Sequence, residues 1–183
     1  RFDGVMLDTL DSPLYLEELD PQKYAGMKEA AVNLLREIKL QYPQLKVMLN
    51  RGFTALPEAA PEIDMLLLES TLTDVMSDPK KPKLHPENVY QDAVKIAKEA
   101  QTVSPELQIF ALDYWKPSDT VGLKKAYQIH RESGFVPYIA TSDLQKVIGE
   151  PRSGKGDDWP YYWRASLLMN MDDINLKSQT SIY

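Results

Sequence analysis

The chain has 183 residues, of which 43% are hydrophobic and 26% charged, values typical of a globular domain rather than a disordered or fibrous protein. Its net charge of -6 opposes binding to nucleic acid, and the absence of cysteine excludes disulfides and thiolate zinc sites. The longest apolar runs, such as residues 65–68, are far shorter than the ~20 residues of a membrane helix, so we expect no membrane insertion.

The first predicted element is a buried strand over residues 2–7, followed by a polar loop that Pro13 closes. A helix is then predicted to begin with Asp20 as its N-cap and Pro21 at its first position. Apolar residues at helical spacing continue as far as Ile38, and the helix is expected to end near residues 42–43.

Two further strands are predicted over residues 45–50 and 63–70, with a short helical stretch between them. The second contains four consecutive apolar residues, which is typical of a strand buried on both faces of a parallel sheet. Residues 71–86 are rich in Asp, Pro and Lys and form a long loop, which we interpret as lying on the substrate side.

The pattern continues with a helix over about residues 86–101 and a fourth strand over residues 107–113. Ser118 or Asp119 can cap the next helix, which is predicted to stop at Gly134. A fifth strand follows over residues 135–141. Strands that alternate with helices in this way predict right-handed crossovers and a parallel α/β sheet.

Two parallel architectures compete, a doubly wound open sheet and a (β/α)8 barrel. No glycine-rich phosphate loop follows any predicted strand, so the nucleotide-binding open sheet lacks its main support. Polar residues do cluster where the strands end, and in a barrel these ends converge on one face that holds the active site. We therefore favour a (β/α)8 TIM-barrel type, with this chain covering about the last five βα units and cut from something longer.

The expected division is a C-terminal part of a barrel over residues 1–149 and an extension over residues 150–183. The extension contains four aromatic residues between Trp159 and Trp163. Such rings either stack on sugars or pack against the barrel rim, and the role of the extension stays open.

Asp8 and Glu69 each follow an apolar run directly, so each is expected to lie partly desolvated at the end of a strand. Hydrolysis of a glycosidic bond needs two carboxyl groups, one to protonate the leaving oxygen and one to attack or to activate water. Partial desolvation makes different acid and base roles possible for such a pair. The alternative for each residue is an ordinary loop or capping acid.

Other polar residues at strand ends are candidates for substrate binding. Asp11 is either a hydrogen-bonding partner in the site or an Asx-turn residue before Pro13. Asn50 and Arg51 suit contacts to hydroxyls or the orientation of a carboxylate, and the alternative is an arginine paired on the surface. Asp113 with Tyr114 suits a sugar subsite, and the alternative is ordinary packing. His85 and His130 have no metal-ligand spacing, so we assign no metal and no cofactor.

Six segments resemble successive motifs of the endo-α-1,4-polygalactosaminidase-like hydrolases, which include glycoside hydrolase family 114 and the Pel polysaccharide hydrolase domain of family 166. The segments are residues 2–11, 50–53, 56–57, 68–70, 112–114 and 134–138. Their order and spacing make the resemblance fairly specific over about residues 1–149.

The resemblance implies a (β/α)8 barrel whose fourth strand is the first one here, so that the missing N-terminal part of the barrel is a candidate partner. It also implies endo-acting cleavage of α-1,4-linked galactosamine or N-acetylgalactosamine polysaccharide, with Asp8 and Glu69 as the catalytic pair. Which acid is the nucleophile stays open. The implied location is secreted or periplasmic, and Tyr138 joins the predicted substrate-binding residues because it lies in the last motif. The alternative function is a non-catalytic carbohydrate-binding or structural fragment of such a barrel.

Overall fold

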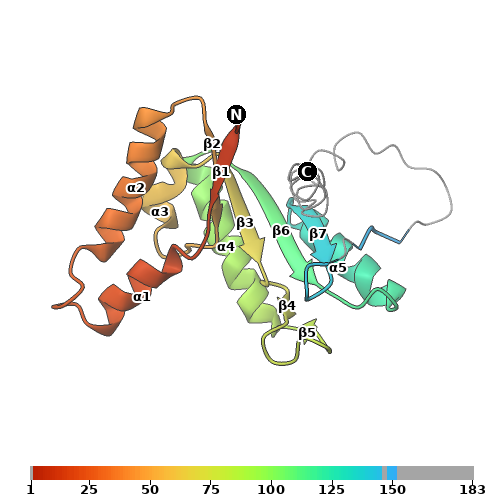
Figure 1. Ribbon diagram of the computed structural model, residues 1–183. Coiled ribbons are helices and arrows are strands. Elements are labelled where there is room, and N and C mark those ends of the chain that lie inside the picture. Colours follow the sequence, from red (N-terminus) through yellow and green to blue (C-terminus); the bar gives the residue numbers. More distant parts are fainter. Residues whose placement is uncertain (1, 146–147, 152–183) are drawn as a thin grey trace, which may run out of the picture.

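A computed structural model of the chain describes residues 2–145 and 148–151 (Figure 1). Its centre is a five-stranded sheet in which every neighbouring pair is parallel. The strands are β1 (Gly4–Leu7), β2 (Lys46–Asn50), β3 (Met65–Glu69), β6 (Gln108–Tyr114) and β7 (Val136–Ala140). A short antiparallel hairpin of β4 (Thr73–Asp74) and β5 (Lys83–Leu84) follows β3.

The spatial order of the five strands is the same as their order along the chain, β1-β2-β3-β6-β7. A doubly wound sheet reverses its strand order at a switch point, and this sheet does not. Because every neighbouring pair is parallel, the carboxyl end of each strand lies beside the carboxyl end of the next. The predicted parallel α/β wiring is confirmed, and the strand order favours the barrel type.

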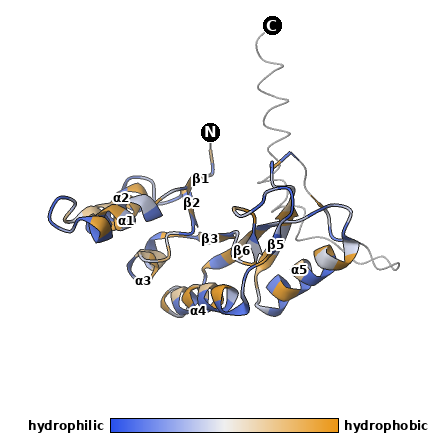
Figure 2. Cartoon of the chain, turned by 90° about the horizontal axis from the view of Figure 1, so that it is seen from below, coloured by the Kyte–Doolittle hydropathy of each residue, from blue (hydrophilic) through white to orange (hydrophobic). Residues whose placement is uncertain are grey.

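Helices connect the strands and cover one face of the sheet. They are α1 (Asp11–Leu19), α2 (Met27–Gln41), α3 (Leu56–Ala59), the 3-10 helix η1 (Ala60–Glu62), α4 (Glu87–Val103) and α5 (Thr120–Glu132). Hydrophilic and hydrophobic residues alternate along α4 and α5, as expected for helices with one side on a core (Figure 2).

The two faces of the sheet have different partners because side chains alternate along each strand. Leu49, Leu66 and Leu68 are fully buried against the helices. Leu67, Leu112 and Tyr114 belong to a second cluster on the opposite face, which we call the inner face. The inner face at the carboxyl ends of the strands is where the candidate site lies.

Two predictions about the first helical region are wrong. The expected polar loop after β1 contains α1, because Pro13 lies in its first turn, where no intrahelical N–H bond is lost. The helix expected to start at Asp20 starts instead at Met27, after Gly26 with φ 83°. Asp20 ends α1, and its carboxylate accepts a hydrogen bond from the Lys23 amide in a turn.

The predicted signals around α5 are confirmed. The Asp119 carboxylate caps the helix by accepting a hydrogen bond of 2.9 Å from the Gly122 amide. Gly134 follows the last helical turn with φ 77°, a conformation that favours glycine.

The outer edges of β1 and β7 have no strand partner within residues 2–145 and 148–151. Beside the β1 edge, Phe2 and Met6 are 87% and 55% exposed. Most of the predicted extension over residues 150–183 lies outside the described residues, so its role stays a prediction. Among the described helices, none combines the length and apolar character that crossing a membrane requires.

Candidate active site

The candidate site is built from side chains that stand where β1, β2, β3 and β6 end. Asp8 follows β1 directly, while Asn50, Glu69 and Tyr114 are the last residues of β2, β3 and β6. Asn50 pairs with Leu67 and Glu69 pairs with Leu112, so the alternation of side chains sends Asn50, Glu69 and Tyr114 to the inner face. The parallel sheet thus brings four separate segments to one place.

Asn50 joins the two predicted catalytic acids. Its Nδ2 atom donates hydrogen bonds of 2.9 Å to Asp8 Oδ1 and 2.7 Å to Glu69 Oε2. The opposite amide orientation would set Oδ1 against two carboxylates, so the hydrogen-bond pattern fixes the orientation. Asp8 and Glu69 therefore face each other across a single nitrogen atom.

Glu69 accepts a hydrogen bond on each carboxylate oxygen. Asn50 donates to Oε2 and the Tyr114 hydroxyl donates to Oε1. Burial first, and then the adjacent Glu69 carboxylate, raise the pKa of Tyr114 well above its usual value, so the phenol stays a donor. Two donors on two oxygens are the arrangement that suits an ionised carboxylate.

Asp8 has a more open environment than Glu69. Its side chain is exposed, and Oδ1 accepts hydrogen bonds from the Thr9 amide and from Asn50. Within the described residues Oδ2 accepts no hydrogen bond, which leaves that oxygen available on the solvent side. The two acids therefore differ in their surroundings, as acid and nucleophile must.

A left-handed residue follows the polar side chain at three of the four strand ends in the site. Thr9, Arg51 and Ser70 have φ of 60°, 57° and 50°, directly after Asp8, Asn50 and Glu69. This conformation costs a non-glycine residue about 1–2 kcal/mol, and it is found disproportionately at functional sites. The turn bends the chain away immediately after each polar side chain, which leaves that side chain at the rim.

Arg51 and Asp11 brace the turn beside Glu69. Arg51 Nη1 donates to the Glu69 carbonyl at 2.9 Å, and its guanidinium lies 5.2 Å from the Phe53 ring centroid. Asp11 Oδ2 accepts from the Gly52 amide at 3.2 Å and lies 4.0 Å from Arg51 Nε. Asp11 therefore supports the turn that carries Arg51.

A cavity of about 390 Å³ opens beside Glu69. Arg51, Glu69 and Tyr114 line it, together with Val75, Met76 and Pro79 from the segment between β4 and β5. That segment lies in the loop predicted on the substrate side. Ser70 and Ser142 also line the cavity, and neither was predicted from the sequence. A left-handed serine directly after a strand-end acid has no sequence signal of its own.

Two predicted substrate-binding residues lie elsewhere. Asp113 is 0% exposed and points to the helix-covered face, because it is one position from Tyr114 in the same strand. Its carboxylate bonds to His130, Leu72 and Thr73, so the structure assigns it to the interior and not to a sugar subsite. Tyr138 lies half-buried on the inner face opposite Leu112 and does not line the cavity beside Glu69.

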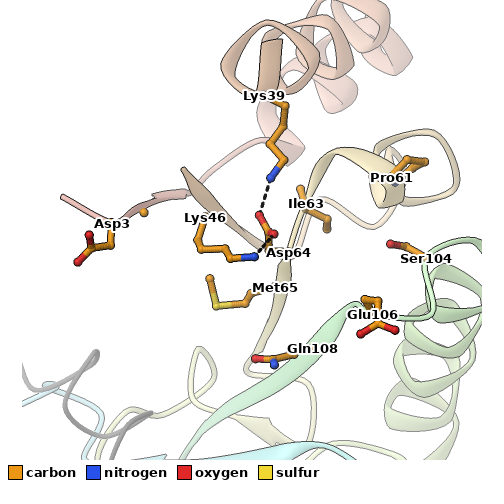
Figure 3. Close-up of a pocket in the computed structure, with 11 residues that line it drawn as sticks. Asp3, Lys39, Lys46, Pro61, Ile63, Asp64, Met65, Ser104, Glu106 and Gln108 are labelled. Atoms are coloured by element: carbon orange, nitrogen blue, oxygen red, sulfur yellow. Dashed lines mark hydrogen bonds and ion pairs between the residues drawn. The ribbon is translucent and has the colours of Figure 1, made fainter. Parts of the chain in front are cut away.

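A second cavity, of about 570 Å³, lies at the other end of the sheet, where the strands begin (Figure 3). Its central acid, Asp64, is bonded by Lys39 at 2.7 Å, Lys46 at 2.8 Å and the Val47 amide at 2.9 Å. Because these three donors bond both oxygens of the Asp64 carboxylate, we assign Asp64 a structural role. No group of three or more His, Asp or Glu in the described part of the chain is arranged to hold a metal ion.

Comparison with known proteins gives matches to glycoside hydrolases. The family model of glycoside-hydrolase family GH114 matches residues 1–167. The solved glycoside hydrolase domain of PelA from Pseudomonas aeruginosa is 26% identical with a TM-score of 0.66, covering 81% of this chain and 56% of that one. A glutamate-to-alanine variant of the same domain gives the same values. No curated protein matches the chain.

The chain spans 56% of the length of the solved domain it matches. With the strand order, these matches confirm an α/β fold of TIM-barrel type, of which the described residues form five consecutive parallel strands.

Proposed function

Because the chain belongs to glycoside-hydrolase family GH114, we propose that it carries the catalytic pair of a glycosidase, Asp8 and Glu69. The observation that supports this most directly is the Asn50 Nδ2 atom, which holds one oxygen of each acid by a hydrogen bond. Two carboxyl groups at this spacing are what hydrolysis of a glycosidic bond requires.

The two environments support different roles. Glu69, with a donor on each oxygen, is the nucleophile, and Asp8, with Oδ2 available, is the acid and base. In the first step a Glu69 oxygen attacks the anomeric carbon, the bond to the leaving oxygen breaks, and Asp8 gives that oxygen a proton. In the second step Asp8 takes a proton from water, the water oxygen bonds to the anomeric carbon, and Glu69 is released.

The spacing of the acids supports retention of the anomeric configuration. Asp8 Oδ1 and Glu69 Oε2 bond the same nitrogen, so the separation of these two oxygens cannot exceed the 2.9 Å and 2.7 Å bonds laid end to end. That upper limit is below the ~6.5 Å at which the range for inverting enzymes begins, and close to the ~5–5.5 Å of retaining enzymes.

The proposed substrate is α-1,4-linked galactosamine or N-acetylgalactosamine polysaccharide, cleaved within the chain. Two observations support this substrate class. The sequence motifs resemble those of the polygalactosaminidase-like hydrolases, and the solved structure that matches the chain is a glycoside hydrolase domain. Asn50, Arg51 and Tyr114 are the proposed substrate contacts beside Glu69, and Asp11 acts through the turn that carries Arg51. Tyr138 is a proposed contact at another place on the inner face, opposite Leu112. We propose that the protein is secreted or periplasmic, as the resemblance to these hydrolases implies.

We also propose that further strands of the same barrel pair with the open edge of β1. The support is the unpaired edge within the described residues, the exposed Phe2 and Met6 beside it, and the longer solved domain. Paired edges are the general solution for parallel strands in barrels.

The test is hydrolysis of a galactosamine-containing polymer by the protein and by Asp8→Asn and Glu69→Gln. Each substitution is expected to lower kcat at least ~10³-fold, and proton NMR is expected to show an α-anomer as the first product. Full activity of both variants would refute the assignment of the pair. Sugar binding that survives both substitutions, with no product from the unsubstituted protein, would favour a non-catalytic carbohydrate-binding fragment.

A further inference from the structure

A chain of buried polar side chains lies behind Glu69, on the helix-covered face of the sheet. His130 Nε2 lies 2.8 Å from Asp113 Oδ2, and His130 Nδ1 lies 3.1 Å from the Tyr90 hydroxyl. The Tyr90 hydroxyl also donates to Ser133 Oγ at 3.0 Å. Asp113 and His130 are both 0% exposed, so this chain contacts no substrate.

The Asp113 carboxylate holds the segment that follows Glu69. Oδ1 accepts from the Thr73 amide at 2.8 Å, from Thr73 Oγ1 at 2.7 Å and from the Leu72 amide at 3.2 Å. A buried carboxylate is tolerated where donors surround it, and here every donor but His130 comes from the two residues Leu72 and Thr73.

Thr73 connects the Asp113 carboxylate to Tyr114 through its hydroxyl. While its hydroxyl donates to Asp113, the same oxygen accepts the Tyr114 amide at 3.0 Å. Tyr114 in turn donates its phenol hydroxyl to Glu69 Oε1. Because Asp113 and Tyr114 are consecutive in β6, one side chain anchors the strand from behind while the other reaches the catalytic acid in front.

We propose that Thr73 and Asp113, with His130 orienting the Asp113 carboxylate, form a positioning clamp that fixes the Tyr114 phenol on Glu69. The inference rests on the proposed function, because it assigns the clamp to the acid of that site. Apolar residues of similar volume often replace a buried acid and its partner without loss of stability, so the presence of such a pair is weak evidence for a purely structural role. Their geometry therefore points to a positioning role.

Thr73→Val separates the clamp from ordinary packing. It keeps the size of the side chain and the Leu72 and Thr73 amide bonds to Asp113, but removes the hydroxyl that donates to Asp113 and accepts the Tyr114 amide. We expect kcat to fall about tenfold with KM within about twofold, because the nucleophile loses alignment while the cavity wall stays in place. Thr73→Ser keeps the hydroxyl and is expected to restore kcat to within about twofold.

A double-mutant cycle with Tyr114→Phe tests the route of the effect. If Thr73 acts through Tyr114, Thr73→Val combined with Tyr114→Phe is no slower than Tyr114→Phe alone. Val32→Ala, which removes buried volume in α2 far from the clamp, is the matched control for lost stability and should leave kcat unchanged. Unchanged kcat in Thr73→Val, or rate losses that multiply in the double variant, would overturn the proposal.

Amide hydrogen exchange measured by NMR gives a readout that does not depend on turnover. The Tyr114 amide is expected to exchange faster in Thr73→Val than in Val32→Ala, when both are compared at equal global stability. If the unsubstituted protein cleaves no polymer, the proposed function fails while this exchange measurement still decides the clamp. Equal protection of the Tyr114 amide in the two variants would refute the clamp even in an active enzyme.

Discussion

At the scale of single residues, the site depends on one amide. Asn50 is 4% exposed, and its Nδ2 is the only nitrogen in the described residues that bonds both Asp8 and Glu69. A neutral donor between two acids reduces their mutual repulsion without adding a charge that would pair permanently with either. A lysine or arginine there would neutralise one acid and remove it from proton transfer.

Asn50→Asp is predicted to abolish most of the activity. It keeps the shape of the side chain but replaces the donor with a third carboxylate between two others. We expect kcat to fall about 10²–10³-fold, the loss typical when one preorganised donor is removed, together with lower stability. Steady-state kinetics and urea unfolding measure the two effects. Asn33→Asp on the exposed face of α2 is the matched control, and similar activity loss there would contradict the prediction.

The sequence predicts which residues lie in the site when it shows clearly where a strand ends. Glu69 and Asn50 each follow an uninterrupted apolar run, so their place at a strand end was visible. Asp113 was assigned to the same end because the apolar run stops there, but β6 continues to Tyr114. The alternation of side chains then sends Asp113 to the opposite face, which only the register with β3 reveals.

At the scale of elements, the turns after β1, β2 and β3 share a left-handed backbone conformation that their residue types do not predict. Glycine is the usual residue at positive φ, yet Thr9, Arg51 and Ser70 occupy these positions. Thr9 is β-branched, for which positive φ is most costly. Nothing in the local sequence marks these three residues, so the turns could not be predicted.

Thr9→Gly is predicted to stabilise the protein while lowering its activity. Relief of the left-handed conformation outweighs the added freedom of the unfolded chain, giving about 0.5 kcal/mol in the free energy of unfolding. The looser turn fixes Asp8 less well, so we expect kcat to fall about threefold. Urea unfolding and kinetics provide the measurements. Thr102→Gly in the exposed last turn of α4 should destabilise instead, and a loss of stability in Thr9→Gly would refute the strain.

Helix boundaries show a second limit of prediction at this scale. The Asp119 cap and the Gly134 stop were correctly predicted, because each acts through its own backbone neighbours. Asp20 and Pro21 predict a helix start equally well, but Asp20 ends α1 and the next helix begins only after Gly26. Glu17 accepts the Gly26 and Lys28 amides, so a side chain nine residues upstream of Gly26 caps α2. A cap from the preceding helix is a tertiary contact, which local signals do not contain.

At the scale of the whole molecule, the two ends of the sheet have different tasks. The carboxyl ends of the strands carry Asp8, Asn50 and Glu69, whereas the amino ends carry Asp64 and its two lysines (Figure 3). Lys39 belongs to α2 and Lys46 to β2, so Asp64 ties both elements to the start of β3. Such a division between a functional end and a stabilising end is general in TIM-type barrels.

Asp64 is therefore predicted to contribute stability that depends on pH and has no effect on catalysis. Burial opposes its charge, but hydrogen bonds from Lys39, Lys46 and the Val47 amide prevail and lower its pKa to about 2. A lowered native pKa stabilises the fold above the unfolded value of 3.8, and the contribution disappears as pH falls towards 2. With solvent screening allowed for, Asp64→Asn should lower the free energy of unfolding by about 1 kcal/mol at pH 7 and by almost nothing at pH 2, with kcat unchanged.

Urea unfolding at pH 7, 4, 3 and 2 measures this loss of stability, with the exposed Glu37→Gln of α2 as control. A difference that persists at pH 2, or a loss of kcat, would show that the two ends are not independent.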